Sequence, residues 1–174
     1  MLNPTDFAFE GSIKVSLWAT FMDNANLYRY LAYFGETYDG WGPRYVIAKS
    51  CSGHMAGRIY TQVIPDDVRV TSLADGEQIP KETWIHIVSV IDQETDTLSL
   101  YINDVFQSSE PIGDFSLVDV CQKVFLGRSI APDAVVPDWH YGVIDDVAIY
   151  VPEPATLLLL SLGVLALRKI KCKV

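Results

Sequence analysis

The sequence predicts an all-β domain, an antiparallel two-sheet jelly-roll sandwich, followed by a C-terminal hydrophobic helix. Three observations support this fold class. Apolar and polar residues alternate with a period of two through much of 7–150, as in strands with one buried face. Turn-forming pairs such as Asp39-Gly40 and Asp75-Gly76 separate the alternating segments. No segment before residue 151 has sustained helical periodicity, so eight or nine short strands favour two packed sheets.

The first expected strand, 13–21, shows the alternation most clearly. Its odd positions are apolar and its even positions are polar, except that Trp18 falls on the polar face. Later strands are expected where apolar runs lie between turn residues. They span 28–34, 44–48, 57–64, 68–73, 84–91, 98–102, a segment that begins at 105, 123–127 and 143–150.

Residues 84–106 predict a meander of antiparallel strands. The segment 84–91 is apolar on both faces, as expected of a strand inside a sandwich, and 92–97 is a charged turn. After the strand at 98–102, the pair Asn103-Asp104 supplies residues that tolerate positive φ, which a tight hairpin requires. The next strand then begins.

The charge of the chain excludes some classes of function. There are 13 Lys and Arg against 22 Asp and Glu, a net charge of -9, so no basic groove for nucleic acid is expected. Three cysteines without a Cys/His cluster are too few for a disulfide scaffold or a structural zinc site. The charge is also uneven, because residues 1–150 hold 9 bases and 21 acids, whereas 151–174 hold four bases and one acid.

Residues 151–174 therefore form a segment distinct from the domain at 1–150. The uncharged run 155–167 would span about 20 Å as a helix, less than the roughly 30 Å hydrocarbon core of a bilayer. A buried core helix is the alternative, although such a helix would show polar residues at helical spacing. Arg168, Lys169 and Lys171 follow the run and would hold that end at the cytoplasmic face, which places the domain outside the cytoplasm.

Pro152, Glu153 and Pro154, followed by the apolar run and the basic end, resemble the PEP-CTERM sorting signal of bacteria that make extracellular polysaccharide. The resemblance implies processing near the tripeptide by an exosortase-type membrane protease, so the helix would anchor the protein in the membrane only transiently. Export also requires an N-terminal signal peptide, and none is present. We therefore expect that the natural start, with its signal and a first strand or two, is missing.

Two motifs in the domain resemble the laminin-G-like, concanavalin A-like jelly-roll superfamily. One is the Trp-x-His-x-Val strand with Trp84, His86 and Val88, and the other is the Tyr-x-Asn-Asp hairpin at 101–104. Leu126-Gly127 and the closing strand at 142–150 extend the similarity over roughly 7–150. The resemblance implies the fold but says little about the ligand. Asp104 stands where the family usually has glycine.

Aromatic residues in loops are the candidate ligand-binding residues. An aromatic ring can stack on a sugar ring while acid and amide groups supply hydrogen bonds. The alternative is that these rings cover the ends of the sandwich. The candidates are Tyr38, Trp41, Tyr60 and Trp139, which lie in or beside loops that contain Gly or Pro.

Asp92, Asp145 and Asp146 are the candidate ligands of a structural Ca²⁺ ion. Hard cations prefer carboxylate and carbonyl oxygens, and the jelly-roll resemblance implies a calcium near a sheet rim. A solvated acidic edge that discourages strand pairing is the alternative. Cys51 and Cys121 either pair in an oxidising exterior or remain free thiols.

No catalytic constellation is evident in the sequence. Glycan hydrolysis needs two carboxylates about 5 to 10 Å apart, and the Glu-x-Asp-x-Glu run of laminarinase-type relatives does not occur here. Asp145 and Asp146 are adjacent and are expected to point to opposite faces of a strand. No Gly-x-Ser-x-Gly elbow is present, and His86 is expected to be a hydrogen-bonded structural histidine.

These observations predict a non-enzymatic, exported bacterial protein of the cell surface or extracellular matrix. Its jelly-roll module would bind an extracellular polysaccharide or a surface protein. A structural or adhesive matrix component without a small-molecule site is the first alternative, and a glycan hydrolase is the second.

Overall fold

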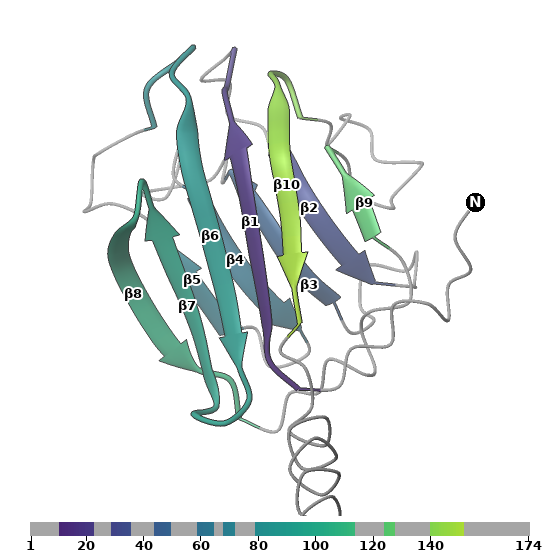
Figure 1. The fold of residues 1–174 in the computed structure, drawn as a ribbon, viewed down its shortest axis with the longest axis vertical. Coiled ribbons are helices and arrows are strands. Elements are labelled where there is room, and N and C mark those ends of the chain that lie inside the picture. The colour runs from purple at the N-terminus through teal and green to yellow at the C-terminus, as the bar shows by residue number, and fades with distance from the viewer. Residues whose placement is uncertain are drawn as a thin grey trace, which may run out of the picture.

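The computed structural model describes residues 11–22, 29–35, 44–49, 59–64, 68–71, 79–113, 124–127 and 140–151. Within these residues ten strands form two five-stranded antiparallel sheets that lie face to face, and no helix occurs (Figure 1). The predicted all-β, two-sheet sandwich is therefore confirmed. The hydrophobic helix expected at 155–167 lies outside the described residues.

The front sheet, nearer the viewer in Figure 1, has the strand order β10-β1-β6-β7-β8. The back sheet has the order β5-β4-β3-β2-β9. The strands of the front sheet are β10 (Ile144–Tyr150), β1 (Ile13–Ala19), β6 (Ile85–Asp92), β7 (Thr97–Ile102) and β8 (Val105–Pro111). Those of the back sheet are β5 (Val68–Thr71), β4 (Ile59–Ile64), β3 (Arg44–Lys49), β2 (Arg29–Gly35) and β9 (Val124–Leu126).

The alternation of β1 separates the core from the outer face of the front sheet. Its odd positions, from Ile13 to Ala19, are at most 1% exposed and join a core cluster that includes Phe34 and Ile47 of the back sheet. Burying each large apolar side chain stabilises the fold by roughly 1.5–3 kcal/mol. The even positions, which include Lys14 and Trp18, are consequently left on the outer face.

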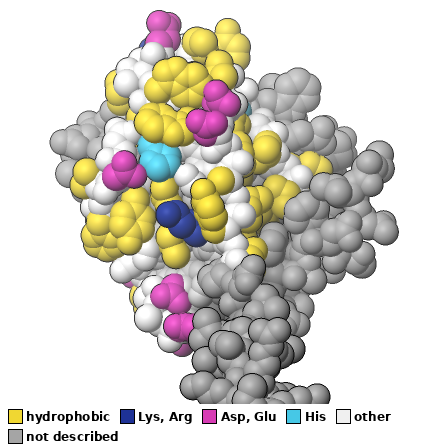
Figure 2. All heavy atoms as spheres, in the orientation of Figure 1, with side chains coloured by type: hydrophobic (Ala, Val, Ile, Leu, Met, Phe, Trp, Pro, Cys, Tyr) yellow, Lys and Arg dark blue, Asp and Glu magenta, His cyan; other side chains and the backbone are white. Residues whose placement is uncertain are grey.

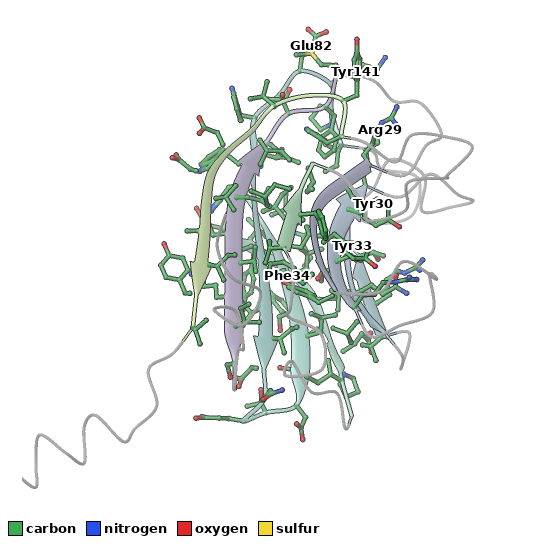
Figure 3. All side chains as sticks on the ribbon, turned by 90° about the vertical axis from the view of Figure 1, so that its right-hand side faces the viewer. Arg29, Tyr30, Tyr33, Phe34, Glu82 and Tyr141 are labelled. Atoms are coloured by element: carbon green, nitrogen blue, oxygen red, sulfur yellow. The ribbon has the colours of Figure 1, made fainter. Side chains whose placement is uncertain are left out.

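The outer face of the back sheet is different, because its described apolar side chains are buried in a second cluster. Tyr33 and Val46 belong to this cluster, and Tyr30 and Phe125 pack against it. Figure 3 shows that Phe34 points between the sheets, whereas Tyr30 and Tyr33 lie on the other side of β2. Among the described residues, large exposed rings on a sheet face therefore belong to the front sheet.

A two-residue turn joins β7 and β8. Asn103 has φ 50° and Asp104 has φ 64°, so both residues adopt the positive φ that was expected of this hairpin. The segment that begins at Val105 forms a complete strand, which brings the described total to ten rather than eight or nine.

A β-bulge interrupts the pairing of β1 with β10. The register shifts between Ser16 and Trp18, and Asp146 opposite this step has φ 46°. The Asp146 N–H donates a hydrogen bond of 2.9 Å to Oδ1 of Asp145, and both aspartates are exposed. The expectation that these two side chains point to opposite faces assumed strict alternation, which a bulge breaks.

Candidate functional site

The outer face of the front sheet carries the candidate site. Exposed rings come from several of its strands: Trp18 on β1 is 37% exposed, Phe106 on β8 is 54% exposed and Tyr150 on β10 is 56% exposed. Figure 2 shows this face, on which apolar, histidine, basic and acidic side chains lie together. Exposed aromatic rings that lie together with charged groups on one sheet face are typical of a binding surface.

His86 lies at the centre of a hydrogen-bonded chain on this face. Its Nδ1 is 3.1 Å from Oδ1 of Asp104, and its Nε2 is 2.8 Å from Oγ of Ser16. Because a carboxylate only accepts hydrogen bonds, Nδ1 must carry the proton, and in the neutral ring the Ser16 hydroxyl donates to Nε2. The imidazole also stacks on Trp18, with the ring centroids 5.0 Å apart and the planes 15° from parallel. These contacts confirm that His86 is hydrogen-bonded.

The register of the sheet and the tight hairpin bring these residues together. Trp18 is paired directly with His86 between β1 and β6. The His86 N–H donates to Oδ1 of Asn103 at 2.9 Å, and the Asn103 N–H donates to the His86 carbonyl at 2.8 Å. The hairpin is thereby fixed against β6. Asp104, in a conformation where glycine is the usual residue, adds the carboxylate that orients the imidazole.

A depression of about 210 Å³ lies beside this chain. Its volume corresponds to about seven water molecules at liquid density, which is room for one sugar ring. Val88 and Val90 supply apolar lining and Tyr101 an aromatic ring, while Lys14 and Asp104 contribute opposite charges. Tyr101 is held by an edge-to-face contact with Phe106, with the centroids 5.4 Å apart. Such a combination suits a ligand with an apolar ring face and polar substituents.

The chain Ser16–His86–Asp104 has the connectivity of a nucleophile, a base and an orienting acid. Acyl transfer also needs hydrogen-bond donors for the developing oxyanion. Ser16 lies in the middle of β1, which is paired on both sides with β6 and β10, so the neighbouring backbone N–H groups donate within the sheet. Ser16, His86 and Asp104 can also exchange hydrogen bonds with a ligand that lies on this face.

The three predicted calcium ligands occupy two separate places. Asp92 ends β6 beside Ser12, whereas Asp145 is paired with Trp18 near the other end of β1. Ser12 and Trp18 are six residues apart in extended chain, so the two places are about 20 Å from each other. No group of three potential metal ligands occurs in the described part of the chain.

Asp92 has a local role in the turn after β6. Its Oδ1 accepts hydrogen bonds from the Glu94 N–H at 2.9 Å and from the Ser12 hydroxyl at 3.2 Å. Hydrogen bonds from the Thr95 side chain and the Glu94 backbone lower the pKa of Asp92 below its usual value. One of its carboxylate oxygens is thus already committed to the turn.

His140 lies at the end of the sandwich, outside the front-sheet site. Its ring makes an edge-to-face contact with Phe21, with the centroids 5.0 Å apart. Burial lowers the pKa of His140. Gly142 is equally confined, because a Cβ atom there would lie 1.9 Å from the Thr20 carbonyl oxygen. Figure 3 labels Tyr141, between these two residues, at this end of the sandwich together with Glu82.

Several predicted site residues lie outside the described residues. Among the described residues, no helix has the length and apolar composition that crossing a membrane requires. Tyr60 is in β4, but its side chain is not described. The others outside the described ranges are Tyr38, Trp41, Trp139, Pro152, Glu153, Pro154, Arg168, Lys169, Lys171, Cys51 and Cys121.

The two-sheet jelly roll with a mixed aromatic and polar face defines a lectin-like class of β-sandwich. The chain belongs to the concanavalin A-like lectin/glucanases superfamily, which it matches over residues 2–152. Residues 151–171 match the PEP-CTERM protein-sorting motif. Both resemblances that the sequence motifs suggested are confirmed.

Several solved structures are similar to this chain. Ruminococcus gnavus IT-sialidase CBM40 bound to α2,3-sialyllactose has a TM-score of 0.62 and 11% identity, over 83% of this chain and 78% of that chain. A variant of NanB sialidase from Streptococcus pneumoniae has a TM-score of 0.65 and 16% identity, over 84% of this chain and 23% of that chain. Domains LG4-5 of the mouse laminin α1 chain have a TM-score of 0.59 and 11% identity, over 82% and 36%. At these identities the likeness establishes the fold alone. No curated protein matches the chain in sequence.

Proposed function

We propose that this chain is a non-catalytic carbohydrate-binding module of an exported bacterial surface or matrix protein. The observation that carries the proposal is the outer face of the front sheet, which holds both exposed rings and a depression with apolar and charged lining. Sugars present the same combination, because their C–H faces stack on aromatic rings and their hydroxyls need hydrogen-bond partners. Trp18, Tyr101 and Asp104 would provide these contacts.

The similar structure from Ruminococcus gnavus supports the ligand class. That protein was solved with α2,3-sialyllactose, and another structure of it holds α2,6-sialyllactose. The fold is thus compatible with glycan binding, while the residues on the front sheet decide what this chain recognises.

The sorting motif supports delivery to the surface. An exosortase-type membrane protease would process the chain near Pro152, Glu153 and Pro154, while 155–167 holds it transiently in the membrane and the basic end stays on the cytoplasmic side. Replacing the tripeptide with alanines should leave unprocessed, membrane-retained protein in cell fractions. Normal release of this variant would contradict the delivery mechanism.

A protein partner in the matrix is the alternative. β8 is the edge strand of the front sheet, and its exposed residues Val105 and Phe106 are 62% and 54% exposed. An apolar edge can bind another chain through strand addition. Disruption of this edge by Val105→Lys would impair a protein contact while leaving glycan binding at Trp18 and Tyr101 in place.

Glycan binding is tested with the full chain, purified in detergent and applied to an array of neutral and acidic polysaccharides. Trp18→Ala and Tyr101→Ala should each weaken retention about ten-fold, because each removes an aromatic contact surface. Tyr141→Ala is the matched control, since it removes a ring that is 60% exposed but lies at the end of the sandwich. Absence of retention, or equal effects of all three variants, would contradict the proposal. Release of reducing sugar would instead support the hydrolase alternative.

A further inference from the structure

We infer that the front-sheet depression selects sugars that carry a carboxylate, such as uronic or sialic acid units, and that Lys14 is the residue that recognises the acidic group. The inference rests on the proposed glycan-binding function and adds the chemical class of the ligand. Two features of the described residues and one of the sequence carry it: the environment of Lys14, the opposite charge contributed by Asp104, and the net charge of residues 1–150.

Lys14 is an exposed cation without a carboxylate partner among the described residues. Its Nζ lies over the ring of Tyr150, 5.6 Å from the ring centroid, and the same side chain lines the depression. A cation held over an aromatic ring keeps its three N–H donors largely available. An ammonium group of this kind binds a carboxylate through charge-assisted hydrogen bonds, which are about twice as strong as neutral ones.

The two charges of the depression have different tasks. Asp104 already accepts a hydrogen bond from His86, so its second carboxylate oxygen suits the hydroxyl groups of a sugar. Lys14 lies on β1, whereas Asp104 lies in the β7–β8 turn, with β6 between these strands. A sugar ring over Val88 and Val90 would therefore place an acidic substituent toward Lys14 and hydroxyls toward Asp104.

The net charge of the whole domain would not attract an acidic sugar. Residues 1–150 hold 9 bases against 21 acids, so the long-range field repels anions. Attraction of an acidic sugar must then be local, and it depends on a cation next to the binding surface. A neutral sugar would gain a hydrogen bond from the Lys14 ammonium group but no attraction between opposite charges, so the structure favours the acidic class.

The test compares matched ligands on the full chain in detergent by isothermal titration calorimetry. The pairs are 3′-sialyllactose with lactose, and a glucuronate-containing disaccharide with its neutral counterpart. We expect the native chain to bind the acidic member of at least one pair about ten-fold more tightly, with a preference that weakens at high salt. Lys14→Met should abolish the preference, Lys14→Arg should retain most of it, and Lys81→Met removes an exposed cation elsewhere as the control.

Each outcome is decisive. Equal binding of acidic and neutral glycans, or a preference that survives in Lys14→Met, overturns the inference while the glycan-binding function stands. Loss of the preference in Lys81→Met as well means that net charge rather than Lys14 is responsible, and it also overturns the inference. If neither these pairs nor any glycan on the array is bound, the proposed function itself fails, and the inference fails with it.

Discussion

Replacing Asp104 with glycine tests whether its carboxylate serves the His86 site or only the hairpin. The φ of 64° costs an L-residue about 1 kcal/mol and glycine almost nothing, but glycine loses about 0.5–1 kcal/mol of conformational entropy on folding. The contact with His86 involves a carboxylate side chain that is 84% exposed, so it contributes at most about 1 kcal/mol. These terms nearly cancel. We therefore expect the free energy of unfolding to change by less than about 1 kcal/mol.

The effect on the site should be much larger than the effect on stability. Without Asp104, nothing described on this side of the imidazole fixes the proton on Nδ1, so nitrogen NMR shifts of His86 should report a mixture of tautomers. Affinity for the glycan should fall several-fold, because both the orienting contact and a carboxylate of the depression are lost. Asp104→Asn is the control, since Asn also tolerates positive φ and its amide oxygen can still accept from Nδ1–H.

Denaturant titration, NMR and calorimetry on the same variants distinguish the two roles of Asp104. A loss of several kcal/mol in Asp104→Gly would mean that the carboxylate holds the fold together, which the three nearly cancelling terms do not allow. Unchanged His86 shifts and unchanged affinity in Asp104→Gly would refute the role of Asp104 at the site.

Three further predictions concern pH, packing and metal binding. Burial lowers the pKa of His140, so the unfolded chain binds a proton more readily than the folded chain does. The melting temperature should therefore fall as the pH drops below about 6.5. His140→Phe should reduce this fall, and a pH profile identical to that of the native chain would contradict the prediction. Gly142→Ala places a Cβ 1.9 Å from a carbonyl oxygen and should lower the free energy of unfolding by about 2 kcal/mol or more. Gly113→Ala has open space around the new Cβ but a φ of +60°, so it should lower the free energy of unfolding by about 1 kcal/mol. Equal losses of stability in the two variants would refute the clash at Gly142. Ca²⁺ should raise the melting temperature through the exposed pair Asp145 and Asp146, and the increase should vanish in a variant with both changed to Asn; an unchanged melting temperature in chelator would exclude calcium.

The fold was predictable because the core and the turns leave local signals in the sequence. The alternation of 13–19 follows directly from one buried face, and the structure leaves its odd positions at most 1% exposed. Asn103 and Asp104 predicted a tight turn because few residue types tolerate positive φ at two successive positions. Neither signal required knowledge of distant contacts.

The candidate site was much less predictable because it depends on register. Trp18 gave one signal, since it was the apolar residue on the polar side of its strand. Ser16, His86 and Asp104 belong to three elements, and their contacts exist only because β1 pairs with β6 in one register and the hairpin is fixed against β6. The bulge at Asp145–Asp146 was equally invisible, because a one-residue insertion in the pairing leaves no pattern in a single strand.

The core and the candidate site are two results of the same alternation. A slip of one residue in β1 would turn its apolar odd positions to solvent and bury Lys14, Ser16 and Trp18, so the free energy of core burial also fixes which side chains face a ligand. That coupling allows a common jelly roll to acquire a specific surface by changes at even positions alone. The hairpin gives a second example, because Asp104 places a carboxylate at a position of positive φ that glycine usually occupies. Specificity in this chain should therefore depend on a few outward residues of the front sheet, whose substitution alters binding while the core beneath them stays packed.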